Sequence, residues 1–203
     1  MKVRVFVTDL LDANCYLISH QDQAIIVDPA GIGEEILEVL KEEQLKLIAV
    51  INTHGHVDHI AGNAWLKDKT GAPILIHRDD AEYLTNPDLN LSPFVSNDII
   101  GPPADQVLDD QTVIHVGGEE LKVIHTPGHT PGGICLLGPG FLISGDTLFK
   151  HSVGRSDFPG GDSRVLRESI LKLKQLPPET IVYPGHGEST TIGDEIKYNM
   201  FMR

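Results

Sequence analysis

Three imidazoles and one carboxylate fall within six consecutive positions of this sequence, 54 to 59. They are His54, His56, Asp58 and His59, and they follow an apolar segment that ends at residue 53. Imidazole nitrogens and carboxylate oxygens are the usual protein ligands of zinc and iron. A buried cluster of this kind is costly unless a cation satisfies it. The spacing therefore predicts a metal site whose remaining ligands come from elsewhere in the chain.

Three other segments repeat one local pattern, in which an apolar strand is followed by a glycine and then by a metal-type side chain. "LKVIHTPGH" ends at His129, "FLISGD" ends at Asp146 and "TIVYPGH" ends at His186. We expect each glycine to let the chain turn sharply where its strand ends. Neighbouring strands that end at one rim would gather these three side chains beside the first cluster.

Together these segments supply more candidate ligands than one tetrahedral ion can bind, namely His54, His56, Asp58, His59, His129, Asp146 and His186. A catalytic zinc takes about three protein ligands and leaves one position open. Seven ligands divide into three, three and one shared, so we expect two divalent ions bridged by Asp146, about 3.5 Å apart. Zinc is the first choice of metal, with iron or manganese as alternatives.

The elements that must position these residues follow from the hydrophobic pattern. Short β-branched runs predict strands at 2–8, 14–19, 24–28, 46–53 and 72–77, and again at 112–116, 120–126, 133–138, 140–144 and 180–184. Apolar residues at helical spacing predict helices at 33–45, 59–71, 163–176 and about 192–202. Segment 86–105 carries several prolines and is expected to be a long loop. The order predicts an α/β fold in one domain, 1–203, with two sheets packed together and helices outside them.

Bulk composition narrows the function further. The chain has 203 residues and a formal net charge of −13, which argues against a nucleic-acid partner and against binding to an anionic membrane. It shows no signal peptide and no apolar run of the ~18 residues that a membrane helix needs. Cys15 and Cys135 lie in separate apolar runs, so we expect buried free thiols and a cytoplasmic location. The oligomeric state is left open by the sequence.

The motifs resemble those of the metallo-β-lactamase superfamily and, within it, the short glyoxalase II-like hydrolases. The similar stretches are "THGHVDHIAGN" (53–63), "TPGHTPG" (126–132), "SGDTLF" (144–149), "GRSDFPGGD" (154–162) and "YPGHG" (183–187), in the family's order. The early "NCYLI" (14–18) and "IIVDPAG" (25–31) fit the family's first strands.

This resemblance implies an αββα sandwich with two mixed sheets flanked by helices and with the metals at one edge of the sheets. Carried over by position, it assigns His54, His56 and His129 to one metal, Asp58, His59 and His186 to the other, and Asp146 to the bridge. Asp28 falls where the family has a buried carboxylate near the site.

The resemblance implies hydrolysis of a small-molecule thioester such as S-D-lactoylglutathione. Metal binding lowers the pKa of water from 15.7 to about 7, so hydroxide forms at neutral pH and can attack the carbonyl carbon. A leaving thiol with a cysteine-like pKa of about 8.5 departs as thiolate without a strong acid. Asp58 is a candidate to steer the hydroxide proton as well as to bind metal. Arg155 is a candidate to grip a substrate carboxylate.

Some positions depart from the glyoxalase II pattern. The chain ends shortly after His186, where full-length glyoxalase II enzymes continue into a helical segment that contacts glutathione. Asp157 and Glu188 stand where that pattern has aromatic residues. The main alternative is a persulfide dioxygenase of the same superfamily with a single iron, because "GRSDF" is close to a stretch of those enzymes. Superfamily ribonucleases fit less well, because the chain is acidic and shows no basic appended domain.

Overall fold

The computed structural model describes residues 1–31, 33–95 and 98–203. Two six-stranded sheets form its centre. The first sheet has the spatial order β1 (Lys2–Val7), β2 (Asn14–His20), β3 (Gln23–Val27), β4 (Lys46–Ile51), β5 (Ile74–His77) and β6 (Gln106–Leu108). Strands β1 to β3 pair antiparallel, whereas β3 to β6 pair parallel, so this sheet is mixed.

The second sheet has the spatial order β14 (Thr190–Thr191), β13 (Ile181–Pro184), β10 (Phe141–Gly145), β9 (Ile134–Gly138), β8 (Glu119–His125) and β7 (Val113–Val116). Its neighbours pair antiparallel except for the parallel pair β10 and β13. A separate two-stranded ribbon joins β11 (Leu148–Phe149) to β12 (Ser152–Val153).

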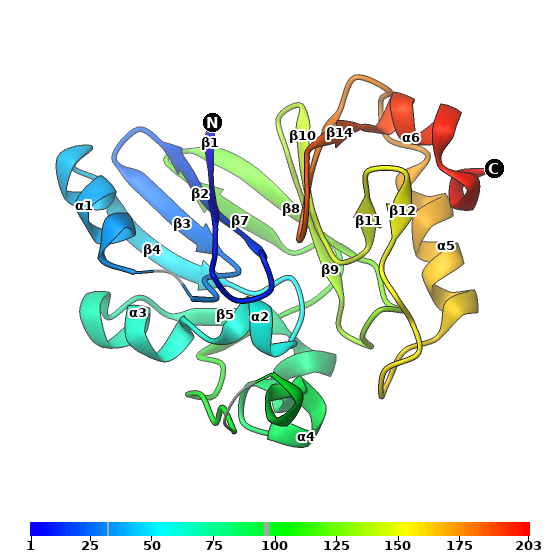
Figure 1. The fold of residues 1–203 in the computed structure, drawn as a ribbon. Coiled ribbons are helices and arrows are strands. Elements are labelled where there is room, and N and C mark those ends of the chain that lie inside the picture. The colour runs from blue at the N-terminus through cyan, green and yellow to red at the C-terminus, as the bar shows by residue number, and fades with distance from the viewer. Residues whose placement is uncertain (32, 96–97) are drawn as a thin grey trace.

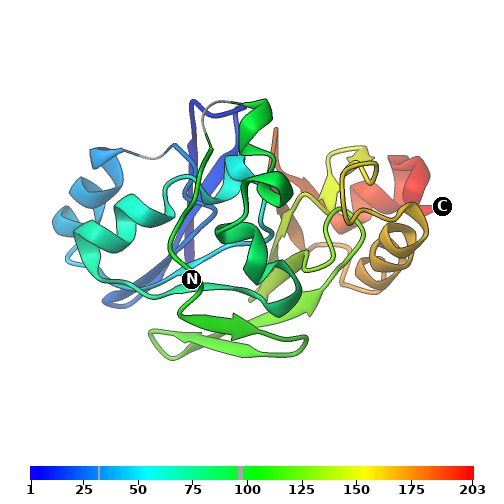
Figure 2. The same cartoon turned by 90° about the horizontal axis from the view of Figure 1, so that it is seen from below.

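Helices cover the outer faces of the two sheets. Figure 1 shows α1 (Glu34–Glu42) and α3 (Asn63–Thr70) beside the first sheet, with α5 (Ser163–Leu173) and α6 (Ile192–Tyr198) beside the second. Figure 2, seen from below, shows these helical layers on opposite sides of the molecule with the strands between them. The predicted αββα sandwich is therefore confirmed. None of the helices in the described ranges is long and apolar enough to span a bilayer.

Three buried apolar layers hold this arrangement together. Ile18, Ile51 and Leu136 belong to the layer between the two sheets. A second layer lies under α1 and α3, and a third, which includes Ile170, lies under α5. Each layer forms because strands alternate their side chains between faces, so both faces of each sheet carry apolar residues that must be covered.

Two expected segments differ in detail. The predicted helix at 59–71 is divided into α2 (Val57–Ile60) and α3, because the side chain of Asn52 donates a hydrogen bond of 3.1 Å to the carbonyl of His59 that a continuous helix would use. The predicted loop 86–105 contains α4 (Pro87–Asn90) and the 3₁₀ helix η2 (Ser92–Phe94), and its residues 96–97 lie outside the described residues. Two further 3₁₀ helices are η1 (Arg78–Leu84) and η3 (Met200–Met202).

Candidate metal centre

The seven predicted ligands lie together where several strands end. His54, His56, Asp58 and His59 follow β4, and the other three follow β8, β10 and β13. They form three overlapping groups, each with ligand atoms within 4.8 Å of one another: His54 with His56 and His129, His54 with His59 and Asp146, and Asp58 with His59 and His186. Strands that are far apart in sequence thus deliver their terminal residues to one place.

Two clusters can be distinguished by their distances. In the first, His56 Nδ1 lies 2.9 Å from His129 Nε2. In the second, Asp58 Oδ2 lies 3.2 Å from His186 Nε2 and 3.6 Å from His59 Nε2.

Asp146 stands between the two clusters. Its Oδ2 is 3.5 Å from His129 Nε2 and 3.7 Å from His186 Nε2, and its Oδ1 is 3.4 Å from His59 Nε2. It therefore occupies the position that a bridging carboxylate would need.

Several inward-facing atoms of this centre have no hydrogen-bond partner among the described residues. They are His54 Nε2, His59 Nε2 and Asp146 Oδ1. A buried polar atom left unsatisfied costs roughly 1–3 kcal/mol, so three in one place need an explanation. The unsatisfied histidine atoms are nitrogens, and a nitrogen lone pair is what a metal cation accepts as a ligand. The donor set therefore fits divalent cations.

Hydrogen bonds on the far side of the rings fix which nitrogen faces inward. Asp28 Oδ2 lies 3.0 Å from His59 Nδ1 and also accepts the Thr53 hydroxyl at 2.6 Å. Thr53 Oγ1 in turn lies 3.2 Å from His54 Nδ1, and the carbonyl of Arg155 lies 2.6 Å from His129 Nδ1. Each Nδ1 has an acceptor and would carry the proton, which leaves each Nε2 free as a ligand. Asp28 orients histidines of both clusters, one directly and one through Thr53.

The histidine pKa values differ between the two clusters. Burial, with His129 adding to it, lowers the pKa of His56 to about 3, and burial lowers the pKa of His54 well below its usual range. Burial also acts to lower the pKa of His59, but the carboxylates of Asp58, Asp146 and Asp28 outweigh it and raise the pKa to about 10. Protons held by the second cluster thus balance its carboxylates, and a bound cation would displace them.

Asp80 is a positioning residue that the sequence reasoning missed. This fully buried carboxylate accepts the amide of Gly55 at 3.0 Å, the amide of Gly132 at 2.6 Å and the hydroxyl of Thr130 at 2.7 Å. Gly55 lies between two ligands of the first cluster, and Thr130 and Gly132 follow His129. Asp80 therefore ties together the loops that carry the first cluster. The one sign of this role in the sequence is that Asp80 is an acidic residue soon after strand β5.

His186 is held from the other sheet. Asn14 Nδ2 donates to the carbonyls of Pro184 at 3.0 Å and Gly187 at 2.9 Å, and the Tyr16 hydroxyl donates to Pro184 at 2.6 Å. The glycine before His186 serves close packing rather than a turn. A Cβ at Gly185 would lie 2.1 Å from Asp146 Oδ1. Of the three glycines in the strand–glycine–ligand pattern, Gly145 with φ +47° and Gly128 with φ +129° hold a backbone conformation that itself favours glycine.

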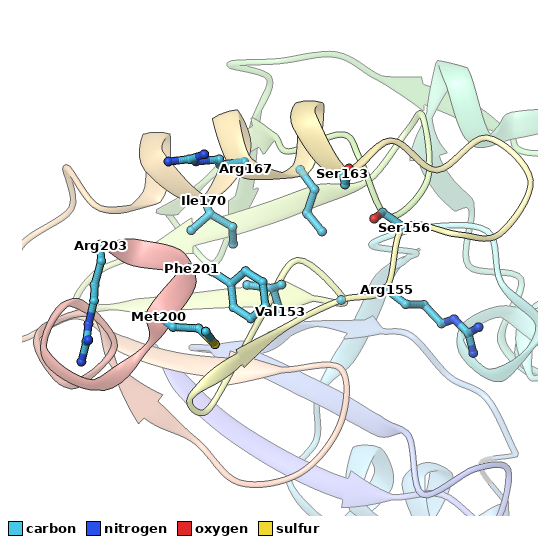
Figure 3. Close-up of a pocket in the computed structure, with 11 residues that line it drawn as sticks. Val153, Arg155, Ser156, Ser163, Arg167, Ile170, Met200, Phe201 and Arg203 are labelled. Atoms are coloured by element: carbon cyan, nitrogen blue, oxygen red, sulfur yellow. The ribbon is translucent and has the colours of Figure 1, made fainter.

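A cleft of about 500 Å³ opens over the centre and is lined by five of the ligands. Arg155 lies at its wall, where its guanidinium makes bonds of 2.7 and 2.8 Å to Asp157 and stacks over the ring of Phe158. A second pocket of about 620 Å³ lies behind the same segment, between α5 and η3, and Figure 3 shows Arg155 pointing away from it. None of the seven ligands lines that second pocket.

One further group of metal-type residues lies apart from the centre. His77, Asp79 and His125 have potential ligand atoms within 4.8 Å of one another. Their two imidazole rings stack at 4.0 Å with an interplanar angle of 12°, which directs the ring lone pairs alongside one another rather than toward a common point. Geometry therefore favours the seven-residue centre over the group of His77, Asp79 and His125 as a metal site.

The chain is similar to known proteins over its whole length. The family model described as "Metallo-beta-lactamase superfamily" matches residues 8–186. The probable metallo-hydrolase YqgX of Bacillus subtilis is 34% identical over 100% of this chain and 98% of its own length. The hydroxyacylglutathione hydrolase GloC of Haemophilus influenzae is 32% identical, with 100% and 98% covered.

Solved structures are similar over nearly the whole chain. The BLEG-1 B3 metallo-beta-lactamase is 36% identical with a TM-score of 0.93, and 99% of each chain is covered. TTHA1623 in a di-iron-bound form is 33% identical with a TM-score of 0.88, covering 98% of this chain and 100% of that one. ETHE1 from Myxococcus xanthus is 28% identical with a TM-score of 0.81, covering 98% and 84%.

Proposed function

The chain belongs to the metallo-beta-lactamase superfamily, and from that premise we propose that it is a dinuclear metal-dependent hydrolase of thioesters. The observation that carries the proposal is the convergence of two ligand clusters on Asp146, with unsatisfied ligand atoms facing inward. Here both are assembled and both are oriented from behind, through Asp28.

The metals would be held by residues already in place. One ion would take His54, His56 and His129, the other would take Asp58, His59 and His186, and Asp146 would serve both. Zinc suits this mixture of imidazole and carboxylate, and iron suits it as well. The similar TTHA1623 was solved in a di-iron-bound form, which supports iron as the second choice.

When bound, two such ions supply Lewis-acid chemistry that lowers the pKa of water and polarises a carbonyl. The rest of the reaction depends on this chain. Asp58 lines the cleft with one oxygen 3.2 Å from His186, so it is placed to steer the proton of the attacking water as well as to bind metal. A thiolate leaving group needs no strong acid. The carboxylates among the described residues that line the cleft are Asp58 and Asp146, both assigned to metal, and this is consistent with a thioester.

The similarity to the hydroxyacylglutathione hydrolase GloC supports a thioester, with S-D-lactoylglutathione as the first substrate to test. The second candidate function is a persulfide dioxygenase with a single iron, which the "GRSDF" stretch favours. The two candidates are separated by metal content, which is two ions per chain for the hydrolase and one iron for the dioxygenase. We also propose a cytoplasmic location, which the two buried free thiols of Cys15 and Cys135 support.

Purification without added metal, followed by parallel assays, tests the proposal. We expect two metal ions per chain and release of thiol from S-D-lactoylglutathione. One iron per chain, with oxygen uptake that depends on glutathione persulfide and with no thiol release, would replace the hydrolase by the dioxygenase.

A further inference from the structure

The cleft over the metal centre is walled mainly by hydrocarbon. Besides five of the metal-type residues, it is lined by Leu11, Val57, Leu91, Phe94, Val95, Phe149, Ser152, Val153, Arg155 and Phe158. Eight of these ten side chains are apolar. Its volume of about 500 Å³ lies within the range of small-molecule sites.

Separate parts of the chain deliver these side chains to the same mouth. Leu11 comes from the β1–β2 turn, Phe94 from η2, Phe149 from the β11–β12 ribbon and Phe158 from the loop before α5. Phe94 is 85% exposed and Leu11 is 55% exposed. Large apolar side chains that remain exposed around a concave site mark a surface for an apolar partner.

Two of the lining leucines hold a backbone conformation that leucine rarely adopts. Leu11 has a φ of 56° and Leu91 has a φ of 66°. This left-handed conformation is unfavourable for a residue that carries a side chain. Such a conformation persists only where the surrounding structure fixes it. Here it accompanies the placement of two apolar side chains at the cleft.

The charge of the cleft does not suit an anionic thiol. Arg155 is the one lysine or arginine among the described residues that line it, and its Nε and Nη2 both donate to Asp157. The nearby Lys150 is likewise paired, with Glu188 at 2.6 Å. Glutathione carries two carboxylates, and the Nε edge of Arg155 that could bind one of them bidentately is already occupied by Asp157. The paired carboxylate would also repel the ligand.

We infer that the cleft selects thioesters that carry an apolar arm, such as an octyl chain, and that it gains little from the charges of glutathione. The inference rests on the proposed thioester hydrolysis and names its substrate class. In the reaction the C–S bond breaks, water adds its oxygen to the acyl carbon, and the products are a carboxylate, a thiolate and two protons, one of which the thiolate can take up. The apolar arm lies on either the acyl or the thiol side of that bond.

Five thioesters separate these cases. Acetyl and octanoyl groups are each placed on glutathione and on the uncharged thiol N-acetylcysteamine, and the fifth substrate is the acetyl thioester of octanethiol. If the apolar arm lies on the acyl side, we expect kcat/KM to rise about tenfold or more from acetyl to octanoyl. If it lies on the thiol side, we expect the same rise from acetyl-N-acetylcysteamine to acetyl octanethiol. Even one methylene in an apolar pocket is worth about tenfold. The change of thiol from glutathione to N-acetylcysteamine should alter kcat/KM less than the chain does.

A binding measurement on the metal-loaded protein gives an independent readout. S-octylglutathione and S-methylglutathione are thioethers that cannot be hydrolysed, and calorimetry should find the octyl compound bound at least about tenfold more tightly.

Two variants with matched controls locate the effect. Phe94→Ser should reduce the octanoyl preference several-fold, whereas Val113→Ser, another exposed apolar residue but far from the cleft, should leave it unchanged. Asp157→Ala frees Arg155 and should improve glutathione thioesters selectively. Glu188→Ala, which frees a lysine that does not line the cleft, should not.

The inference would be overturned, with thioester hydrolysis left intact, if octanoyl substrates showed no gain over acetyl and acetyl octanethiol showed no gain over acetyl-N-acetylcysteamine. A clear preference for glutathione on either acyl group would also overturn it. If none of the five thioesters is hydrolysed, the proposed function fails instead. The thioether calorimetry then decides the inference by itself, and equal affinity for the octyl and methyl compounds would overturn it.

Discussion

Removal of the Asp80 carboxylate should loosen the first cluster of the metal centre and destabilise the fold. The carboxylate is 0% exposed and accepts hydrogen bonds from two backbone amides, Gly55 and Gly132, and from the hydroxyl of Thr130. Each buried donor left without a partner costs roughly 1–3 kcal/mol. The hydroxyl can turn to another acceptor, but the two amides cannot, so Asp80→Ala should lower the free energy of unfolding by about 3–5 kcal/mol.

Asp80→Asn keeps one acceptor oxygen and should cost less, about 1–3 kcal/mol. Asp79→Ala is the matched control. The Asp79 carboxylate is next to Asp80 in the sequence, but it is half exposed and its ionic contact is a 3.7 Å approach to His77. We expect that control to stay within about 0.5 kcal/mol of the wild type. Urea unfolding of the metal-free and metal-loaded proteins measures these values.

Asp80→Ala and Asp80→Asn should also lose metal affinity, because the loops tied by Asp80 carry His54, His56 and His129. Mutation of a residue that orients metal ligands typically weakens metal binding about 10–100-fold. Competition with a chelator measures this loss, and Asp80→Asn keeps the test open if the alanine variant does not fold. If both Asp80 variants unfold like Asp79→Ala and bind metal normally, the three hydrogen bonds do not hold the centre and the reasoning is wrong.

Three further predictions concern single residues. Asp146→Asn removes the negative charge shared by both clusters, so elemental analysis should find one metal lost per chain, with a large fall in thioesterase rate; two retained ions with normal turnover would exclude a bridge. Asp28→Asn should weaken metal binding about 10–100-fold in a chelator titration, because it disturbs the acceptor of His59 and Thr53; unchanged affinity would contradict this role. Burial, together with the stacked His125, lowers the pKa of His77 in the folded state, so the unfolded chain binds the proton more readily and the stability contributed by neutral His77 falls as pH drops below about 6.5. In His77→Gln, urea unfolding should therefore show a shallower loss of stability below that pH, and an identical pH profile would contradict it.

The strand-end pattern made the metal centre predictable from the sequence. Each ligand follows an apolar run that becomes a strand, and strands that end at one rim bring their next residues together whatever their separation along the chain. The same pattern could not separate Asp79 from Asp80. Both follow β5, and only the packing of η1 decides which carboxylate turns inward to the amides of Gly55 and Gly132.

Contacts between side chains of neighbouring loops were also beyond the sequence. Arg155 suggested a grip on a substrate carboxylate, but its pairing with Asp157, two positions away, depends on loop geometry that no periodicity encodes. The break between α2 and α3 likewise depends on a tertiary hydrogen bond from Asn52. The glycine of "YPGH" was expected to make a turn, whereas Gly185 is required by the closeness of Asp146.

The central claim is that this chain builds a two-metal centre from seven residues. Anomalous diffraction from crystals of the protein purified without added metal tests it most directly, because the signal gives the number of ions and their positions together. We predict two peaks about 3.5 Å apart, one among His54, His56 and His129 and the other among Asp58, His59 and His186, with Asp146 contacting both. A single peak, or peaks located elsewhere, would contradict the account.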